Sequence, residues 1–493
     1  MDEFAESECE VCNFSGMLTS MEKKIIIIGG GLAGSEAALQ LAERGFAVRL
    51  IEMRPVVGTP VHKGSGFAEL VCSNSLKSMK SDSAAGMLKA ELAALGSHVY
   101  AAALRNQVAA GGALAVDREK FAADVTEKVE NHPLITVERR EALDIEAECV
   151  GVDAVVLASG PLTSDALSAS LMALTGSEHM AFYDAAAPVV MADSLDHEKL
   201  FSQSRYEDGE GDYLNAPFTR EEYEAFIDAL LSADRVIKKD FEQKDLFQAC
   251  QPIEEVARAG YDAPRFGTMK PVGLTDPRTG RRPWAALQLR AEDVHGSCYN
   301  LVGFQTNLTF PEQRRVFSMI PGLGNAEFAR YGVMHRNTFI NAPQLLDDHG
   351  RLISAEARKL PVPVYVAGQL SGTEGYCEAI RSGLHVALAV AADLSGVALP
   401  KLPEQTVYGA LLAYATNPDT VDYQPMHVNF GIIEPLEQKV RNKRDRYAAY
   451  AERGSAALAV YLQSLKDAGL VVGGAVSAVQ LEASGELNEG LNA

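Results

Sequence analysis

One stretch near the N-terminus constrains the fold more than any other. Residues 23–55, KKIIIIGGGLAGSEAALQLAERGFAVRLIEMRP, contain a run of isoleucines, a glycine-rich turn, an amphipathic stretch and a second apolar run. This order predicts a buried strand at 24–29, a helix at 32–44 and a second strand at 47–52. The chain is therefore expected to open with a βαβ unit, the building block of a Rossmann-like α/β fold.

The glycines of this turn match a dinucleotide-binding fingerprint. Gly29, Gly31 and Gly34 fit GxGxxG. The first glycine allows the tight turn, the second lets the backbone approach a pyrophosphate, and the third lets helix and strand pack closely. The helix N-terminus then offers free N–H groups to phosphates. Glu52, at the end of the second strand, is placed to bind a ribose diol, which favours FAD or NAD. The predicted cofactor-binding residues here are Gly29, Gly30, Gly31, Leu32, Ala33, Gly34 and Glu52.

Two later segments favour FAD over NAD. DAVVLASGPLTS, at 153–164, predicts a strand that runs into a glycine turn. VPVYVAGQLSGTEGYCEAIRSGLHVALAV, at 362–390, predicts a strand, a glycine-rich turn and a long helix. A chain that returns to its nucleotide-binding domain in this way is typical of flavoproteins, so FAD is the expected tightly bound cofactor. The second turn would contact it through Gly368, Gln369, Gly372, Thr373 and Gly375.

The length of the chain, 493 residues, predicts two or three domains. We expect a FAD-binding domain in two parts, residues 21–183 and 345–470, the second part with C-terminal helices. An inserted domain that mixes helices with a small sheet is expected at 184–344. Residues 1–20 and 471–493 are expected to be disordered extensions.

Composition excludes several classes of protein. The formal charge of −21 argues against a protein that coats nucleic acid non-specifically. No apolar run reaches the roughly 20 residues of a membrane span, and the acidic start lacks a secretory signal. We therefore expect a cytoplasmic protein. Seven scattered cysteines do not form a disulfide framework, and the lone CxxC at Cys9 and Cys12 makes a poor zinc site, so no metal is expected.

Two cysteines stand in polar surroundings. Cys72, in AELVCSNSLKS, is followed by Lys77 and Lys80 in what we expect to be a helical turn. Cations and hydrogen-bond donors favour a reactive thiolate, although a buried filler thiol is an equal alternative on composition alone. Cys250, in FEQKDLFQACQPIEEVARAG, follows an amphipathic helix and precedes Pro252. The cysteines expected to be structural are Cys149, Cys298 and Cys377.

Several separate segments in a fixed order carry a family resemblance. They are GGGLAGSEAALQLAERG, FAELVCSNSLKS, LFQACQPIEEVARAG, RFGTMKPVGL, NLVGFQTNLTFPEQRRVFSMIPGL and YVAGQLSGTEGYCEAIRSG. From about residue 22 to 450 the chain resembles the folate- and FAD-dependent tRNA uracil-5 methyltransferases, often called TrmFO. The resemblance implies a GidA-like α/β fold, a two-part Rossmann-like FAD-binding domain with an inserted α+β domain. The N-terminal extension departs from the family pattern.

The resemblance also implies a reaction. A uridine in the T-loop of tRNA is methylated at C5, with 5,10-methylenetetrahydrofolate as carbon donor, FAD as carrier and reductant, and NAD(P)H as electron source. Cys72 and Cys250 correspond to the two catalytic cysteines. One thiolate adds to C6 of the uracil and makes C5 nucleophilic, while the other assists as base or shields the flavin adduct. We favour Cys250 as the nucleophile.

The RNA would have to present an unstacked base, at a cost of a few kcal/mol that phosphate and stacking contacts offset. The candidate phosphate contacts are Arg278, Arg281, Arg282, Arg314, Arg315, Lys443 and Arg444. Each of these basic stretches could equally be a solvated face. No membrane contact and no obligate protein partner are expected.

Other functions stay open on the sequence. The same chemistry could act on a ribosomal RNA uridine, or the chain could be a general FAD- and NAD(P)H-dependent oxidoreductase. A dinucleotide sensor or RNA-binding module would leave the two polar thiols unexplained. The related flavoprotein that builds carboxymethylaminomethyl groups on wobble uridines is longer, with a large C-terminal helical domain.

Overall fold

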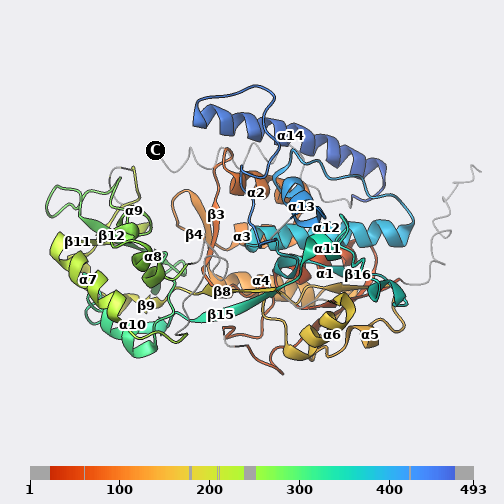
Figure 1. The fold of residues 1–493 in the computed structure, drawn as a ribbon, viewed down its shortest axis with the longest axis horizontal. Coiled ribbons are helices and arrows are strands. Elements are labelled where there is room, and N and C mark those ends of the chain that lie inside the picture. Colours follow the sequence, from red (N-terminus) through yellow and green to blue (C-terminus); the bar gives the residue numbers. More distant parts are fainter. Residues whose placement is uncertain are drawn as a thin grey trace, which may run out of the picture.

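The computed structural model describes residues 23–59, 61–176, 180–207, 209, 211–237, 251–420 and 423–471. These residues form two lobes (Figure 1). One lobe is built from the N-terminal and C-terminal thirds of the chain and the other from the middle third. Strands β8 (Met180–Ala185) and β15 (Met334–Phe339) pair antiparallel and run between the lobes as a two-stranded ribbon.

The larger lobe is organised by a five-stranded parallel sheet in the order β16-β7-β1-β2-β6. Its strands are β1 (Lys24–Ile28), β2 (Ala47–Glu52), β6 (Ile135–Arg139), β7 (Ala154–Leu157) and β16 (Val364–Val366). The isoleucines of β1 are buried, as expected for a central parallel strand that is covered on both faces. The predicted βαβ unit is confirmed, with helix α1 (Leu32–Glu43) between β1 and β2. The return of the chain to this sheet through β16 is confirmed as well.

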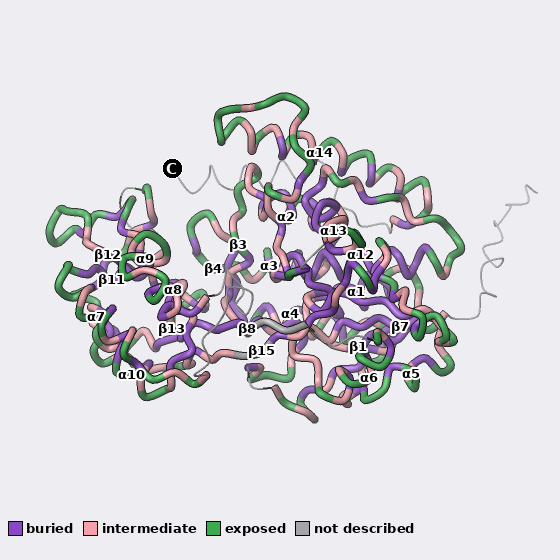
Figure 2. Tube along the Cα trace, in the orientation of Figure 1, coloured by how far each residue is buried: buried purple, intermediate pink, exposed green. Residues whose placement is uncertain are grey.

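Helices α1 and α12 (Tyr376–Ser395) pack directly on each other in the core of this lobe. Each follows a parallel strand through a glycine turn, so both begin at the carboxyl edge of the sheet, where ligands bind in α/β folds. Figure 2 shows buried backbone concentrated around α1, α12, β1 and β7. The remaining helices are α2 (Ala84–Ala94), α3 (His98–Arg105), α4 (Arg118–Glu130), α5 (Ile145–Glu148), α6 (Asp165–Thr175), α11 (Ala342–Leu345), α13 (Val407–Thr416) and α14 (Lys443–Asp467).

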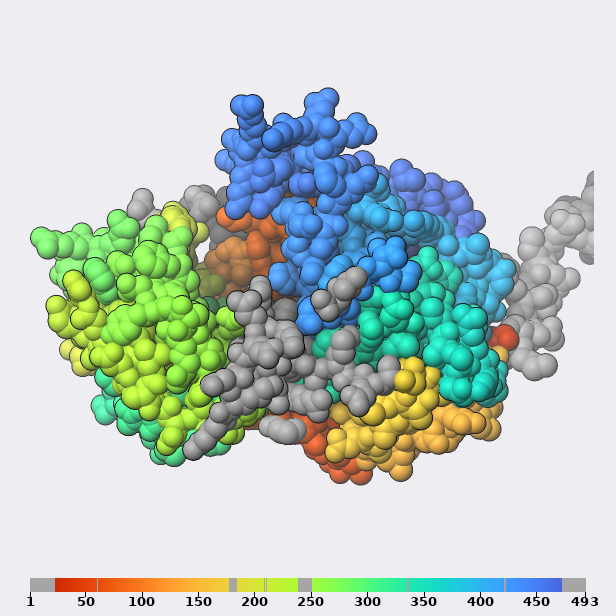
Figure 3. All heavy atoms as spheres, in the orientation of Figure 1, coloured from red at the N-terminus to blue at the C-terminus, as the bar shows by residue number. Residues whose placement is uncertain are grey.

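The inserted lobe has its own hydrophobic core over a six-stranded antiparallel sheet, in the order β10-β11-β12-β13-β9-β14. The strands are β9 (Val189–Met191), β10 (Phe201–Ser202), β11 (Tyr213–Phe218), β12 (Ala285–Ala291), β13 (Cys298–Leu301) and β14 (Phe328–Arg330). The helices are α7 (Arg220–Ser232), α8 (Ile253–Ala259), α9 (Ala263–Phe266) and α10 (Phe310–Phe317). Helix α7 begins with a capping box between Thr219 and Glu222. Figure 3 shows a recess between this lobe and the blue C-terminal elements.

The predicted helical turn after Cys72 is wrong. Residues Ser75–Ser78 form strand β3, which pairs antiparallel with β5 (Ala113–Val116), and β5 also pairs with β4 (Gln107–Val108). Lys77 has φ +68°, a left-handed conformation that an α-helix cannot contain. The predicted extension at 1–20 and nearly all of the predicted tail lie outside the described residues. Within the described ranges, no helix combines the length and apolar character needed to span a membrane.

The contact between α1 and α12 gives a stability prediction. A Cβ at Gly383 of α12 would lie 2.2 Å from the carbonyl oxygen of Ala33 in α1, and backbone cannot move aside cheaply. Gly383→Ala gains about 1 kcal/mol of helix propensity but must push the helices apart. We expect the free energy of unfolding, measured in urea, to fall by about 1–3 kcal/mol. Gly58→Ala is the control, because its added Cβ meets no atom within 4 Å. A Gly383→Ala protein more stable than wild type would contradict this packing.

Candidate functional site

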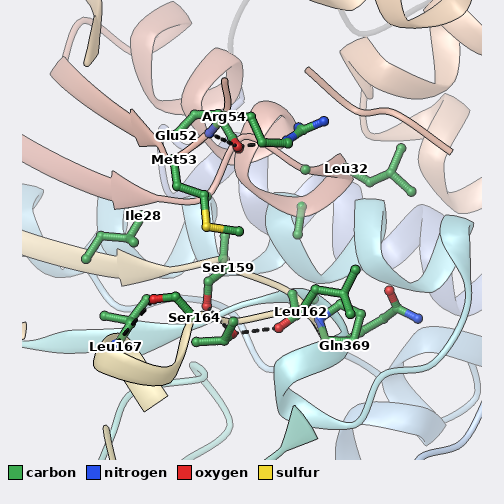
Figure 4. A pocket seen from close by; sticks show the side chains of 18 of the residues that line it. Ile28, Leu32, Glu52, Met53, Arg54, Ser159, Leu162, Ser164, Leu167 and Gln369 are labelled. Carbon is green, nitrogen blue, oxygen red and sulfur yellow. Dashed lines mark hydrogen bonds and ion pairs between the residues drawn. The ribbon is translucent and has the colours of Figure 1, made fainter. Parts of the chain in front are cut away.

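A cleft of about 970 Å³, partly open to solvent, lies at the carboxyl edge of the parallel sheet. It is lined by the glycine turn after β1, by Glu52 and Met53 at the end of β2, by the turn after β7, and by Gly368 and Gln369 after β16. Figure 4 shows these segments converging, with the Met53 side chain reaching toward Ser159. We call this space the nucleotide cleft.

The three fingerprint glycines occupy the positions that their predicted roles require. Gly29 has φ +107°, and a Cβ there would lie 2.4 Å from the Ala158 carbonyl oxygen. A Cβ at Gly34 would lie 1.8 Å from the Gly29 carbonyl oxygen, so only glycine allows α1 to pack on the turn. A Cβ at Gly31 would meet nothing within 4 Å. Gly31 therefore leaves open space on the cleft side of the turn, where the backbone can approach a pyrophosphate.

Glu52 is a buried carboxylate that closes the cleft at the end of β2. It accepts hydrogen bonds from the Gly30 N–H (2.8 Å), the Arg54 N–H (3.0 Å) and Arg54 Nε (2.9 Å). Burial alone would raise the pKa of Glu52, but the Arg54 cation and these donors outweigh it and hold the pKa below its usual range. The group is therefore an ionised acceptor, which suits a ribose diol. The cradle and this carboxylate fit the adenosine and pyrophosphate of FAD.

A second space, of about 910 Å³, adjoins the nucleotide cleft. The two share the lining residues Val71, Pro161, Gln369 and Tyr376. Because Cys72 lines the second space, we call it the Cys72 pocket. A thiol thus lies in a pocket next to the predicted cofactor cleft.

Tyr376, the first residue of α12, holds the Cys72 loop. Its phenol oxygen accepts the backbone N–H groups of Cys72 (3.0 Å) and Ser73 (3.2 Å). The half-buried Cys72 Sγ lies 3.7 Å from the Ala185 carbonyl oxygen. Burial raises the pKa of Tyr376 well above its usual value, so the phenol stays neutral. The loop that carries the thiol is therefore anchored to the start of the helix beside it.

The polar residues after Cys72 have a structural task that the sequence did not reveal. Asn74 is fully buried; its Nδ2 donates to the carbonyl oxygens of Val116 (3.1 Å) and Ala291 (3.0 Å). Its Oδ1 accepts from Arg290 Nε of the inserted lobe at 2.8 Å. Asn74 therefore ties the cysteine loop to both lobes instead of activating the thiol.

Five further polar residues of the Cys72 pocket were missed from the sequence: Asp184, Gln305, Asn337, Glu374 and Glu378. They stand at distant chain positions, and only the fold brings them together; Glu374 alone lies in a turn that the sequence had marked. Cys377, expected to be structural, also lines this pocket. Burial raises the pKa of Cys377 to about 11, so it remains a neutral thiol near pH 7.

The predicted RNA-binding residues differ in their surroundings. Arg278 pairs with Asp276 (2.8 Å) and Arg315 with Glu312 (2.5 Å), so both guanidinium groups are already engaged. Arg314 Nε donates to the Tyr331 hydroxyl at 3.0 Å. All seven members of the set are exposed, and those that form no ion pair within the described residues include Arg281, Arg282, Lys443 and Arg444. Cys250 lies outside the described residues.

Comparison with known proteins identifies the family. Residues 24–398 match the family model described as glucose inhibited division protein A, GIDA. The TrmFO methylenetetrahydrofolate–tRNA-(uracil-5-)-methyltransferase of Thermosynechococcus vestitus is 52% identical over 431 residues, 87% of this chain and 92% of the relative. The corresponding Geobacter sulfurreducens protein is 52% identical over 446 residues, 90% of this chain and 100% of the relative. The chain belongs to the TrmFO family, within GIDA.

A solved relative supports the fold of this TrmFO-family chain. The structure of Aquifex aeolicus GidA in its form II crystal superposes with a TM-score of 0.63, covering 95% of this chain and 76% of that one. Its sequence identity of 16% shows a shared fold and no more. The predicted GidA-like α/β fold, with an insertion in a Rossmann-like domain, is confirmed.

The glycine cradle of this TrmFO-family chain gives a second prediction. Gly31→Val adds a side chain where the protein itself has open space, so the fold should tolerate it, but a pyrophosphate in the cleft would be displaced. We expect FAD per protein, measured by absorbance, to fall more than about 10-fold, while the free energy of unfolding of the apoprotein changes by less than about 0.5 kcal/mol. Normal FAD content in Gly31→Val would rule out this position for the cofactor.

Proposed function

We propose that this protein methylates C5 of a uridine in the T-loop of tRNA, in the cytoplasm, with 5,10-methylenetetrahydrofolate as carbon donor. The observation that carries the proposal is that the Cys72 pocket lies directly beside the nucleotide cleft, with four lining residues in common. The curated relatives bear the name of this activity at about half identity over most of the chain, which supports the same substrate class.

The cleft supplies the residues that would hold FAD. The N–H groups at the start of α1 and the open face of Gly31 suit its pyrophosphate, and Glu52 suits the adenosine ribose. The turn from Gly368 to Gly375 leads from the cleft to the Cys72 pocket. When bound, FAD supplies the redox chemistry that turns a methylene group into a methyl group, with electrons from NAD(P)H.

The protein itself supplies the nucleophile. A cysteine thiolate that adds to C6 of uracil makes C5 nucleophilic toward the one-carbon unit. We propose Cys250 for this addition and Cys72 for the assisting role beside the cofactor. The Cys72 loop is held by Tyr376 and Asn74, which suits a thiol that must keep a constant distance from a bound ring.

We propose that the RNA lies along the basic and aromatic surface of the inserted lobe and the start of α14. Arg281 and Arg282 are exposed, as are Lys443 and Arg444 in the first turn of α14. Phe310, Tyr331 and Phe328 form a stack with ring centroids 4.6 and 4.9 Å apart. Arg314 caps Tyr331. Such combinations bind phosphates and unstacked bases.

The methylation assay tests the function directly. Purified holoprotein, NADPH and labelled methylenetetrahydrofolate are incubated with an unmodified tRNA transcript, and the product is mapped. We expect label at C5 of the T-loop uridine. The same reaction is run with ribosomal RNA fragments. Label only in these fragments would identify ribosomal RNA as the substrate. A holoprotein inactive on both would refute the methyltransferase assignment.

Cys72 should be required for this reaction. Cys72→Ala removes the thiol that this loop places in the pocket, so we expect methylation to fall at least about 100-fold. FAD content and tRNA affinity should stay within about 2-fold, because the loop anchors are backbone groups and Asn74. Cys298→Ala, a half-buried thiol on β13, is the matched control and should retain activity. If Cys72→Ala were as active as Cys298→Ala, Cys72 would not be a catalytic residue.

The exposed arginine pair gives a binding prediction. Glutamate at both Arg281 and Arg282 should weaken tRNA binding about 10-fold or more at low salt and reduce the salt dependence of affinity, with FAD content unchanged. The matched control reverses the charges of Arg358 and Lys359, an exposed basic pair near β16. If both double variants bind tRNA like wild type, Arg281 and Arg282 do not contact the RNA.

A further inference from the structure

Two buried polar side chains of the Cys72 pocket have atoms without hydrogen-bond partners in the described part of the chain. Glu374 is 4% exposed and Asn337 is 1% exposed. Glu374 Oε1 accepts from Gln369 Nε2, but its Oε2 has no partner, nor has either polar atom of the Asn337 amide, within the described part of the chain. A buried polar atom without a partner is destabilising, because it has lost its hydrogen bonds to water. Both side chains line the pocket, so a ligand there can supply the missing partners.

The two groups are held by different elements. Glu374 stands in the turn before α12, and its backbone N–H donates to the Met426 carbonyl oxygen at 2.9 Å. Asn337 lies on β15, and Asp184 on the paired strand β8 is its diagonal neighbour in the register of the ribbon. The pocket therefore presents a carboxyl from a turn and an amide from a strand, two separate parts of the fold.

The charges around Glu374 keep it protonated. Burial is the larger cause, and the carboxylates of Asp184 on β8 and Glu378 on α12 act in the same direction. Lys77 on β3 opposes them, but its Nζ is paired with Glu378 at 3.3 Å. Together these raise the pKa of Glu374 to about 8. At neutral pH the pocket thus contains a carboxylic acid that can donate a proton and regain it.

We propose that Glu374 is the general acid that protonates the C4 carbonyl oxygen of the target uracil while a cysteine thiolate adds to C6. This inference rests on the proposed function. The sulfur forms a bond to C6, the C5=C6 electron pair moves to C4–C5, and the C4=O electron pair takes the proton from Glu374. The products are an enol and the Glu374 carboxylate. When C5 attacks its electrophile, the carbonyl re-forms and the proton returns to Glu374.

The Asn337 amide fits the same base. Its Oδ1 can accept the uracil N3–H beside the Glu374 donor. Glu374 and Asn337 together therefore match the uracil edge, which has an acceptor oxygen on C4 next to a donor at N3. Cytosine has an amino donor at C4 and an acceptor at N3, and it would place donor against donor. The flavin ring carries an imide edge with the same acceptor and donor groups as uracil. The experiment must therefore show whether Glu374 and Asn337 bind the uracil or the flavin.

The test is exchange of the uracil C5 hydrogen, which needs no methyl donor. Holoenzyme is incubated with a tRNA transcript tritiated at uracil C5, without folate or NADPH. Addition of the thiolate makes C5 basic, so reversible protonation releases tritium to water. We expect release by wild type and at least about 100-fold slower release by Glu374→Gln. FAD absorbance and tRNA affinity should be unchanged.

The matched control is Glu254→Gln. Glu254 is buried in the inserted lobe, and burial raises its pKa to about 7, but it accepts from Thr306 Oγ1 (3.0 Å) and Asn307 N–H (2.6 Å) and does not line the Cys72 pocket. We expect its exchange rate to equal that of wild type. Because the protonated form of Glu374 is the active one, wild-type exchange should decline as pH rises through about 8. Glu374→Gln should lack this decline.

The outcomes are distinct. Exchange by Glu374→Gln at the wild-type rate would overturn the assignment and leave the proposed function intact. A shifted flavin spectrum or weakened FAD binding in Glu374→Gln, with exchange retained, would indicate that Glu374 binds the imide edge of the flavin. That result would also overturn the assignment of Glu374 as the general acid. Absence of exchange by wild type under conditions where tRNA binds would refute the proposed chemistry together with this step.

Discussion

The close contact of α1 with α12 is the constraint on which the rest of the structure depends. Gly383 touches the Ala33 backbone across 350 positions of sequence, so the N-terminal and C-terminal parts of the chain share one core. Both helices start at the same edge of the sheet, and their first turns face the nucleotide cleft and the Cys72 pocket. A looser contact would separate the cradle for the pyrophosphate from the turn that carries Gln369 and Glu374.

A second set of buried polar contacts fixes the inserted lobe against this core. The Arg118 guanidinium forms a buried ion pair with Glu292 and donates to the Leu70 carbonyl oxygen at 2.7 Å. Arg290 contacts Asn74 in the same region. Breaking one partner of a buried pair leaves an uncompensated charge, so such contacts specify one arrangement of the lobes. Arg118 also donates to the Cys72 carbonyl oxygen at 3.5 Å, so these contacts reach the cysteine loop itself.

Local patterns in the sequence predicted the nucleotide cleft well and the Cys72 pocket poorly. The glycine spacing and Glu52 lie within one βαβ unit, where periodicity and turn chemistry determine the geometry. Glu374 stands in a glycine-rich turn that was recognised, but its role depends on a strand pair formed by residues far away in sequence. The predicted helix at Lys77 failed because pairing with β5 overrides local propensity.

The ribbon of β8 and β15 has a mechanical consequence. Its two strands join the lobes, and they also carry Asp184 and Asn337 into the pocket. A hydrogen-bonded ribbon twists as one body, so a rotation of the inserted lobe must move both side chains relative to Glu374 on the other lobe. A macromolecule that rotated the inserted lobe would therefore change the separation of Glu374 from Asp184, whose charge helps to raise the pKa of Glu374.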